Sequence, residues 1–538
     1  MLTLNKDSLA NKKDWGATGV ALPQFDIDKM RLQTKSEPIW VHIGSGNIFR
    51  GFIAALQHEL LDIGKANTGI VAVEVYDEEI IQKIYKPHDD LSLLVLLNPD
   101  GTTDKRIIAG VGESLIGSPE NKNDWERLKS IFTCPSLQMV SFTITEKGYS
   151  LKTLDGDYLP DVKYDLMKGP SSPRNTMSKA LALAYERFKA GGCPIAFVSM
   201  DNCSNNGDIL RNAMLDIATH WVENNLVEPS FFDYISNLEK VSFPWTMIDK
   251  ITPRPSEIIR DDLEKTGVAG MDIICTDKKT YIAPFVNAET PQYLVIEDSF
   301  PNRRPTLELG GAIFTTRENV KNAERMKVTT CLNPLHTALA IFGCLLGYRL
   351  IADEMRDARL HKLVEKIGYN EGMPVVVDPI IIDPMEFIKE VIEKRLPNPF
   401  IPDTPQRIAT DTSQKIPIRF GETLKFYLNH DELDIKSLRF IPLVLAGWCR
   451  YLMAVDDNGD EMPLSSDPML EELQQNFITV KLGQPATAEG ALKPILSSKK
   501  LFGLDLYEAG LGEQIEDYFK QMIAGKNAVN ETLNKYLG

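Results

Sequence analysis

The sequence lacks the patterns that mark disulfide-rich proteins, membrane spans and zinc enzymes. Its seven cysteines form no CxxC pair, so we expect reduced thiols and a cytoplasmic location rather than a disulfide framework. There is no HExxH motif and no Cys/His group with ligand spacing, so we expect no metal site. The richest apolar stretch, 338–348, is shorter than the ~18 residues of a membrane span.

Positive charge is also in short supply. The chain carries 59 Lys and Arg against 75 Asp and Glu, a net charge of −16. Nucleic acids and anionic membranes are bound through basic surfaces, so we expect neither as a partner. A small molecule is the expected ligand, and nothing in the sequence indicates an oligomeric state. With 538 residues, of which 43% are apolar, the chain is typical of a globular protein with two or more domains.

Apolar patterns near the N-terminus predict a nucleotide-binding sheet. Residues 39–43 are typical of a buried strand, and Gly44-Ser45-Gly46 of a tight turn. Apolar residues then recur at helical spacing over 48–60, and a second strand is expected at 69–75. Strand, glycine turn, helix and strand in this order form the βαβ unit of a dinucleotide-binding fold.

The rest of the chain divides into an α/β part and a helical part. Strands expected at 139–145 and 194–200 end in polar loops, and a helix is expected over 176–190 between them. Helical periodicity dominates from about residue 320. We therefore predict an α/β protein with two domains: a Rossmann-like domain over residues 1–318, preceded by a polar and irregular strap at 1–35, and a mostly helical substrate domain over 319–538.

The glycine turn is a candidate cofactor site. Glycines at positions 44 and 46 let the backbone approach a pyrophosphate at a helix N-terminus, where free N–H groups favour negative charge. The third glycine of GxGxxG is missing, because Phe49 occupies its position. We assign Gly44, Gly46 and Asn47 to cofactor binding; an ordinary turn is the alternative.

An acid at the end of the second strand would bind the adenosine ribose. Glu74 and Asp77 both qualify, and the choice between them stays open, as does the alternative of a surface acid. No Arg or Lys stands beside them, so we expect NAD rather than NADP. The loops after the strands should meet at one edge of a parallel sheet, which would bring Gly44, Asp77, Glu146 and Asn202 together.

The segment 327–336, KVTTCLNPLH, is the most informative. Asn333-Pro334 is typical of a helix N-cap followed by proline, which would place His336 in the first turn. A cap, a first-turn histidine and a surface lysine would explain the segment without any function. The alternative is alcohol–ketone chemistry, in which Lys327 is a general base, Asn333 donates to a developing alkoxide and His336 orients a hydroxyl.

Several segments together resemble the polyol-specific long-chain dehydrogenases, the family of mannitol 2-dehydrogenase and fructuronate reductase (D-mannonate oxidoreductase). The segments are HIGSGNIFR (42–50), FTITEKGY (142–149), DNCSNNG (201–207), WTMIDKITP (245–253), VIEDSFP (295–301), KVTTCLNPLH (327–336) and RIATDTSQKIP (407–417). The resemblance implies an NAD-binding Rossmann domain, a helical C-terminal domain and metal-independent catalysis.

The resemblance also implies roles for individual residues. They are Lys327 as general base, Asn202 and Asn333 as oxyanion hole, His336 as holder of substrate hydroxyls, Asp249 and Lys415 as pocket lining, and Glu146 at the proton exit.

The chain departs from the family pattern in several places. The family usually has five steps from its lysine to its asparagine, whereas Lys327 to Asn333 is six. The asparagine is followed by Pro334-Leu335-His336 instead of Gly-x-His, which predicts a bulge or an altered helix start. Asp249-Lys250 replaces Asp-Arg, and Phe49 stands where mannitol-type members often carry histidine.

Basic residues in the pocket-like segments favour an acidic substrate. Arg254, Arg407 and Lys415 could pair with a carboxylate. Together with the resemblance, which implies the substrates, this predicts an NAD-dependent oxidoreductase that interconverts a secondary alcohol and a ketone on a sugar acid, D-mannonate and D-fructuronate. One alternative is a mannitol or related polyol 2-dehydrogenase acting on fructose; another is a non-catalytic nucleotide-binding relative.

Overall fold

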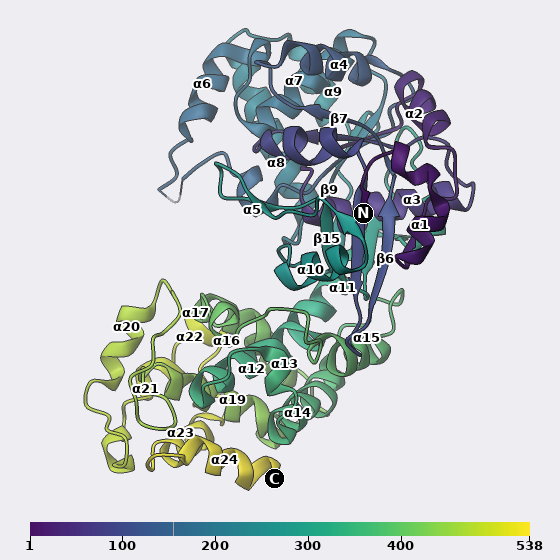
Figure 1. Cartoon of the computed structure of the whole chain (residues 1–538). Coiled ribbons are helices and arrows are strands. Elements are labelled where there is room, and N and C mark those ends of the chain that lie inside the picture. The colour runs from purple at the N-terminus through teal and green to yellow at the C-terminus, as the bar shows by residue number, and fades with distance from the viewer. Residues whose placement is uncertain (154) are drawn as a thin grey trace. The chain divides into compact units, whose positions relative to one another are not determined.

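The computed structural model describes residues 1–153 and 155–538, which form two compact units. The first contains residues 1–98 and 102–321, and the second contains residues 99–101 and 322–538. Every strand labelled in Figure 1 belongs to the first unit, whereas the labelled elements from α12 onward are helices of the second.

The first unit is built around a six-stranded, entirely parallel sheet. In spatial order its strands are β10 (Val241–Ser242), β9 (Ile195–Ser199), β8 (Met139–Phe142), β3 (Trp40–Ile43), β4 (Ile70–Glu74) and β7 (Val111–Ile116). Because all the strands run the same way, the loops that follow them meet at one edge. This confirms the predicted α/β fold and the predicted common edge.

Side chains of β3 alternate between two hydrophobic clusters, as a sheet covered on both faces requires. Val41 and Ile43 belong to one cluster and Trp40 to the other, and all three are buried. The helices of this unit are α1 (Lys12–Ala17), α2 (Ile27–Ser36), α3 (Ala54–Asp62), α4 (Lys122–Thr133), α5 (Thr145–Tyr149), α6 (Pro160–Lys168), α7 (Thr176–Lys189), α8 (Asn206–Glu223), α9 (Pro229–Ser236) and α10 (Glu257–Lys265).

Smaller sheets complete the first unit, and the sequence patterns did not predict their pairing. A mixed sheet has the order β15 (Phe285–Glu289), β5 (Ser92–Leu97), β6 (Thr103–Ile108) and β2 (Val20–Ala21); a second has β11 (Thr246–Asp249), β16 (Tyr293–Glu297) and β17 (Ile313–Thr315). Two-stranded pairs join β1 (Leu2–Thr3) to β12 (Val268–Ala269) and β13 (Ile274–Cys275) to β14 (Tyr281–Ile282).

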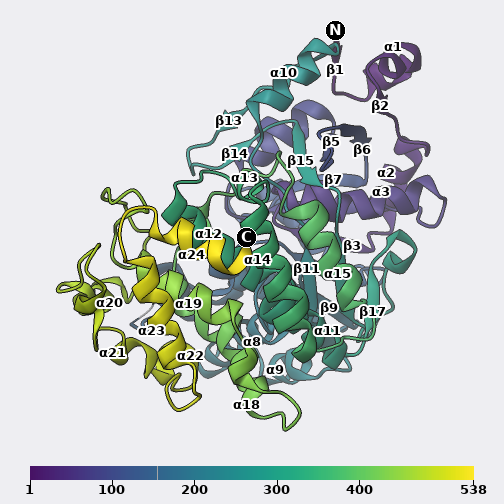
Figure 2. The same cartoon turned by 90° about the horizontal axis from the view of Figure 1, so that it is seen from below.

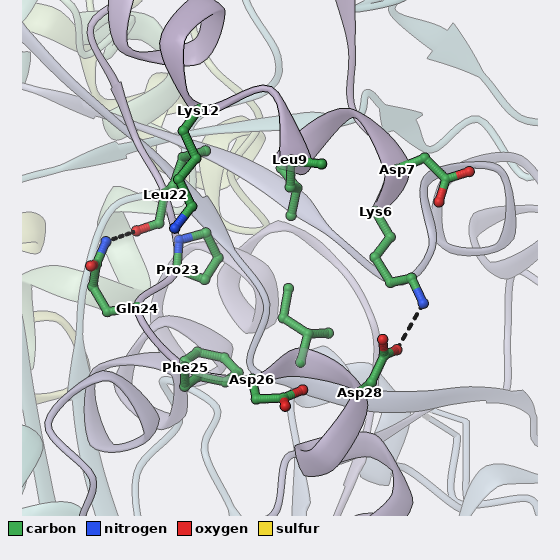
Figure 3. Close-up of a pocket in the computed structure, with 12 residues that line it drawn as sticks. Lys6, Asp7, Leu9, Lys12, Leu22, Pro23, Gln24, Phe25, Asp26 and Asp28 are labelled. Carbon is green, nitrogen blue, oxygen red and sulfur yellow. Dashed lines mark hydrogen bonds and ion pairs between the residues drawn. The ribbon is translucent and has the colours of Figure 1, made fainter.

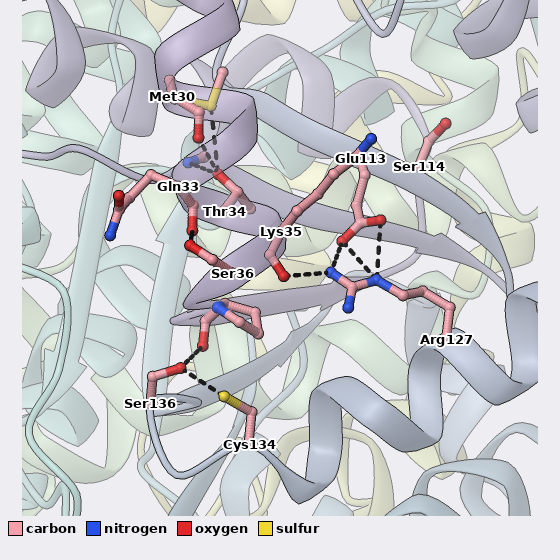
Figure 4. A network of polar contacts seen from close by, with 12 residues as sticks. Met30, Gln33, Thr34, Lys35, Ser36, Glu113, Ser114, Arg127, Cys134 and Ser136 are labelled. Atoms are coloured by element: carbon pink, nitrogen blue, oxygen red, sulfur yellow. Dashed lines mark hydrogen bonds and ion pairs between the residues drawn. The ribbon is translucent and has the colours of Figure 1, made fainter.

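The expectation of an irregular strap at residues 1–35 is wrong. This segment contains α1 and α2, and its Trp15 is fully buried. Figure 4 shows how α2 is fastened: Arg127 donates to the carbonyl oxygen of Lys35 at 3.0 Å and pairs with Glu113. The hydroxyl of Thr34 also accepts the backbone N–H of Gly69 at 2.7 Å. The N-terminal segment is therefore an integral part of the first unit.

The same segment bounds a small surface pocket of about 590 Å³. Figure 3 shows its lining, in which Lys6 and Asp28 form an ion pair at 2.8 Å. Both side chains are largely exposed, so this pair contributes little to stability. None of its lining residues belongs to a loop that follows a strand of the parallel sheet.

The second unit is helical in all of its named elements. Figure 2 shows α12, α19, α23 and α24 side by side, in agreement with their packing contacts. The helices are α12 (Asn333–Leu346), α13 (Ile351–Glu354), α14 (Ala358–Glu365), α15 (Pro384–Glu390), α16 (Pro405–Ile408), α17 (Thr412–Ile416), α18 (Glu422–Leu428), α19 (Phe440–Tyr451), α20 (Leu470–Gln474), α21 (Lys493–Leu496), α22 (Lys499–Phe502), α23 (Gly512–Met522) and α24 (Ala528–Leu537).

One continuous helical stretch, Arg317–Leu346, includes α11 (Arg317–Met326), the turn Lys327–Cys331 and α12. By length and composition alone it could cross a membrane, but 78% of its apolar window is buried inside the protein. Burial of this kind is typical of a core helix.

Candidate active site

The glycine turn after β3 needs glycine at position 44. Gly44 has a φ of +102°, and a Cβ there would lie 2.2 Å from the carbonyl oxygen of Thr143. Gly46 is different, because a Cβ at that position would have no atom of the described chain within 4 Å. Gly44 therefore lets the backbone pass close to the residue that follows β8. Gly46 leaves open space where a side chain would otherwise stand.

The helix that follows the turn explains the missing third glycine. It begins at Asn47 and passes through a π-helical turn, η2 (Phe49–Ile53), before α3. Phe49 is fully buried and stacks on His42 of β3, with ring centroids 4.3 Å apart. Arg50, also buried, donates to the amide oxygen of Asn47 at 2.9 Å. In the GxGxxG pattern the third glycine lets the helix pack closely against the strand. Here the ring of Phe49 fills the space between the helix and β3 instead.

Glu74, at the end of β4, holds the turn in place. Its carboxylate accepts backbone N–H groups from Ser45 at 2.9 Å, Val75 at 3.1 Å, Tyr76 at 3.0 Å and Asp77 at 3.2 Å. Burial raises the pKa of Glu74, and these hydrogen bonds oppose that shift. The carboxylate thus joins the glycine turn to the loop after β4.

Asp77 lies beside Glu74 and is also buried, with 2% exposure. It accepts a hydrogen bond from the hydroxyl of Thr276 at 2.6 Å. Gly44, Gly46, Glu74 and Asp77 all line one cleft of about 590 Å³. Its volume is typical of a ligand site, and its glycine edge and acidic end fit the pyrophosphate and ribose of a dinucleotide.

Asp201 ties the loop after β9 to the loop after β8. Its carboxylate accepts the backbone N–H of Ile144 at 2.8 Å and of Thr145 at 2.9 Å, and the hydroxyl of Tyr149 at 2.6 Å. Thr145 has a φ of +63°, an uncommon conformation for a β-branched residue. Asp201 therefore holds a strained turn that starts α5, the helix that carries the exposed Glu146.

The remaining residues of the DNCSNNG segment anchor the loop from the other side. Asn206 exchanges hydrogen bonds with Thr246: its amide donates to the Thr246 hydroxyl at 2.9 Å and accepts from the Thr246 N–H at 3.0 Å. A Cβ at Gly207 would lie 2.5 Å from the carbonyl oxygen of Phe243. The motif thus positions the exposed Asn202 at the carboxyl edge of the sheet.

Two other predicted site residues of the first unit follow β11. Asp249 is the last residue of this strand and is buried. Arg254 is exposed, and its guanidinium lies 4.7 Å from the centroid of the Tyr281 ring. Its carbonyl oxygen accepts the amide of Asn287 at 3.0 Å.

In the second unit, Lys327 begins a π-helical turn, η7 (Lys327–Cys331). The side chain is buried, with 2% exposure. The backbone N–H of Leu332 donates to the carbonyl oxygen of Lys327 at 3.1 Å, an i to i+5 bond. A π turn holds one residue more than an α turn, so it absorbs the extra residue of the six-step spacing.

The expectation that Asn333 caps a helix is wrong. The cap position is Leu332, no side-chain cap bond forms, and Asn333 is the first residue of α12 with Pro334 after it. The preceding helix does not end before α12, so few N–H groups need a cap. Within residues 1–153 and 155–538, the side-chain amide of Asn333 makes no hydrogen bond.

His336 lies one turn further along α12. Its Nε2 is 3.5 Å from a carboxylate oxygen of Asp403 and makes no hydrogen bond in the part of the chain described. Burial lowers the pKa of His336 to about 4, Asp403 opposes the shift, and Arg419, Arg407 and Arg395 add to it. The imidazole is therefore neutral at pH 7 and can accept or donate one hydrogen bond.

The predicted basic residues Arg407 and Lys415 lie in the same unit. Arg407, on α16, pairs with Asp403 and thus has its charge compensated. Lys415, on α17, donates to the carbonyl oxygens of Ile408 and Thr410. Burial, followed by Arg419, lowers the pKa of Lys415.

Sequence reasoning missed Arg395, Arg419 and Asp201. The two arginines lie in π-helical turns, η10 (Val391–Arg395) and η11 (Pro417–Gly421). No motif marks them, although Arg419 stands four positions after Lys415. Asp201 belongs to the DNCSNNG segment, but the resemblance assigns a role only to its neighbour Asn202. Among the described residues, no group of three or more His, Cys, Asp or Glu side chains is placed to hold a metal ion.

Comparisons with known proteins find similarity over most or all of the chain. A model of the mannitol dehydrogenase Rossmann domain matches residues 38–309, and a model of the mannitol dehydrogenase C-terminal domain matches residues 319–523. The chain is 56% identical to a D-mannonate oxidoreductase of Thermotoga maritima, over 100% of this chain and 99% of the relative. It is 28% identical to a mannitol 2-dehydrogenase of Emericella nidulans, over 94% of this chain and 93% of the relative. Among solved structures, Pseudomonas fluorescens mannitol 2-dehydrogenase in complex with NAD and D-mannitol has a TM-score of 0.69, with 26% identity and coverage of 100% and 99%.

Proposed function

The chain belongs to the mannitol dehydrogenase family, and on that premise we propose that it is an NAD-dependent oxidoreductase that interconverts D-mannonate and D-fructuronate. The substrate is assigned from the similarity to a D-mannonate oxidoreductase, which extends over the full chain at 56% identity. The identity to a mannitol 2-dehydrogenase is half as high, 28%. The arginines around His336 support an acidic substrate. Oxidation of a free polyol such as D-mannitol is the second candidate, because the structural neighbour carries that ligand.

The cofactor would be held at the carboxyl edge of the parallel sheet. Gly44, Gly46 and Asn47 would receive the pyrophosphate at the start of the helix. Either Glu74 or Asp77 would take the adenosine ribose, and the negative charge at this end of the cleft disfavours a 2′-phosphate. When bound, NAD supplies the acceptor for the hydride that leaves the alcohol carbon.

The proton of the alcohol needs a base, and we assign that role to Lys327. The side chain is buried, with 2% exposure, and a lysine in a site closed to water can serve as a general base. As the O–H proton passes to the amine and the C–H bond breaks, the carbon–oxygen bond becomes a carbonyl. Glu146, exposed on α5, would pass the proton on to solvent.

Charge that develops on the substrate oxygen needs donors. The amides of Asn333 and Asn202 would supply them, and one well-placed donor of this kind contributes about 3 kcal/mol to transition-state stabilisation. Neutral His336 would hold a substrate hydroxyl. Asp249, Arg254, Arg407 and Lys415 would line the substrate pocket.

A substrate panel tests the proposal. NADH absorbance is followed with D-fructuronate and with D-fructose, and each reaction is repeated with NADPH and after dialysis against EDTA. We expect turnover with D-fructuronate and NADH, a much lower kcat/KM with D-fructose, and no loss after EDTA. Preference for D-fructose would favour the polyol candidate, and no turnover with either would favour a binding-only relative.

A further inference from the structure

Arg419 has no acidic partner. Its guanidinium donates to the hydroxyl of Thr337 at 2.5 Å, and no carboxylate of the described residues lies within ion-pair distance. The side chain is only partly exposed, and burial lowers its pKa to about 10. A guanidinium that has lost water without gaining a counter-charge is unfavourable, because a buried charge is normally paired.

The neighbours of Arg419 belong to the candidate active site. Thr337, its hydrogen-bond partner, directly follows His336 on α12. The turn that carries Arg419, η11, packs against η7, the turn that begins with Lys327. Arg419 therefore lies beside residues to which the resemblance gives catalytic and substrate-binding roles.

A second cation, Lys415, lies next to Arg419 and forms no ion pair among the described residues, although Asp411 and Asp467 are near enough to favour its charge. Lys415 donates only to backbone carbonyl oxygens and is close enough to Arg419 for their charges to repel. Arg407, in contrast, already pairs with Asp403. Arg419 and Lys415, two cations without an ion-pair partner in the described chain, lie beside an imidazole whose Nε2 makes no hydrogen bond, and an anion would stabilise this arrangement.

We propose that Arg419, with Lys415 beside it, binds the carboxylate of the sugar-acid substrate and so determines specificity for the acid over the neutral polyol. This inference rests on the proposed function. Arginine suits the task, because its planar guanidinium can form two parallel hydrogen bonds with a carboxylate. A neutral hexitol or ketose would leave the two cations without an ion-pair partner, so it should bind less well.

The test compares Arg419→Met and Arg419→Lys with wild type on an acid and a neutral substrate. The kcat/KM for D-fructuronate should fall on the order of 10²-fold in Arg419→Met, as expected when one partner of a buried charge pair is removed. Most of the loss should appear in KM. The kcat/KM for D-fructose should change little. For Arg419→Lys, the kcat/KM for D-fructuronate should lie between the values of wild type and Arg419→Met. Arg356→Met, which removes an arginine that is 70% exposed, is the matched control and should leave both values unchanged.

Binding provides a second measurement that does not depend on turnover. D-mannonate should raise the Tm of wild type and of Arg419→Lys, and should do so much less for Arg419→Met. Equal losses of kcat/KM with the acid and the neutral substrate would assign Arg419 a structural role and overturn the inference. If Arg419→Met fails to fold, Arg419→Lys decides: an unchanged ratio of kcat/KM for D-fructuronate to kcat/KM for D-fructose would also overturn the inference. Wild type that uses D-fructose but not D-fructuronate would overturn the proposed function and this inference with it. If wild type prefers D-fructuronate and Arg419→Met keeps the same preference, the inference is overturned but the proposed function stands.

Discussion

Leu332 donates its backbone N–H to the carbonyl oxygen of Lys327 across 3.1 Å, and this bond closes a π-helical turn between α11 and α12. The turn accounts for the extra step between Lys327 and Asn333. One additional residue inside a single wide turn leaves the helices before and after it on nearly the same faces. The lysine and the asparagine can therefore keep the relation that a five-step α-helical spacing gives to other family members.

Deletion of Val328 should consequently be tolerated. Val328 is the least buried residue of the π turn, and its removal should convert the turn into regular α-helix. We expect a folded protein that retains measurable activity. Deletion of Leu339 within α12 is the control, because it would rotate the buried face of a regular helix and should abolish folding. Circular dichroism and kcat distinguish the outcomes; two equally unfolded variants would contradict the insertion account.

The two glycines of the cofactor turn should respond differently to alanine. Gly44→Ala forces a Cβ to within 2.2 Å of a backbone oxygen at a φ of +102°, so Tm should fall even without cofactor. Gly46→Ala meets no atom within 4 Å, so Tm should stay near the wild-type value. Its Cβ would occupy the space proposed for the pyrophosphate, so the Kd for NADH, measured by fluorescence, should rise at least about tenfold. Unchanged NADH binding in Gly46→Ala would place the pyrophosphate elsewhere.

Asp201→Ala should lower both stability and kcat. The substitution leaves the N–H groups of Ile144 and Thr145 without their charged acceptor, a loss of about 2–4 kcal/mol in the free energy of unfolding. The strained turn at Thr145 should relax, which would displace Glu146 and Asn202 together. Urea denaturation and steady-state kinetics measure the two effects. The exposed Asp157 provides the control, since Asp157→Ala should change neither.

Glu354 should make the free energy of unfolding fall as the pH rises from acidic to neutral values. Its carboxyl is fully buried, neither oxygen has a hydrogen-bond partner in the described chain, and burial raises its pKa well above the ordinary value. The folded state therefore keeps a proton that the unfolded state releases above about pH 4.3. Because the native state binds more protons, the free energy of unfolding falls as pH rises, by at most about 1.4 kcal/mol per pH unit.

Glu354→Gln should remove this dependence. The loss of unfolding free energy between pH 5 and pH 8, measured by urea denaturation, should shrink in this variant. Glu432→Gln, at an exposed site, should leave it as in wild type. An identical pH dependence in wild type and Glu354→Gln would show that this carboxyl ionises freely in the folded protein.

Local signals in the sequence were sufficient for the main features of the fold. The buried strand at 39–43, the glycine turn and the helix after it depend on neighbouring residues, and all three are confirmed. The N-terminal strap was misjudged because polar residues outnumber apolar ones there. Its order comes from a few buried side chains such as Trp15 and from distant partners such as Arg127.

Residues of the candidate site could be predicted from the sequence only where they belong to a recognisable motif. Asp201 binds a turn 56 and 57 positions earlier in the chain, and no local pattern reports such a contact. Arg419 becomes notable only when its surroundings show that no carboxylate compensates it. The six-step spacing predicted a bulge or an altered helix start, but the sequence could not say which. The π turn packs against η11 and α18, which lie about 90 positions further along the chain, and the spacing alone does not specify these contacts.

The most direct test of the account is Lys327→Ala, with Lys321→Ala, an exposed lysine of α11, as its control. Loss of a general base should lower kcat for D-mannonate oxidation by about 10²–10⁴-fold with little change in KM. Added primary amines should restore part of that rate, whereas Asn333→Ala should not respond to them. Lys321→Ala should behave as wild type. Nearly full kcat in Lys327→Ala would contradict the account, because the base would then be another residue.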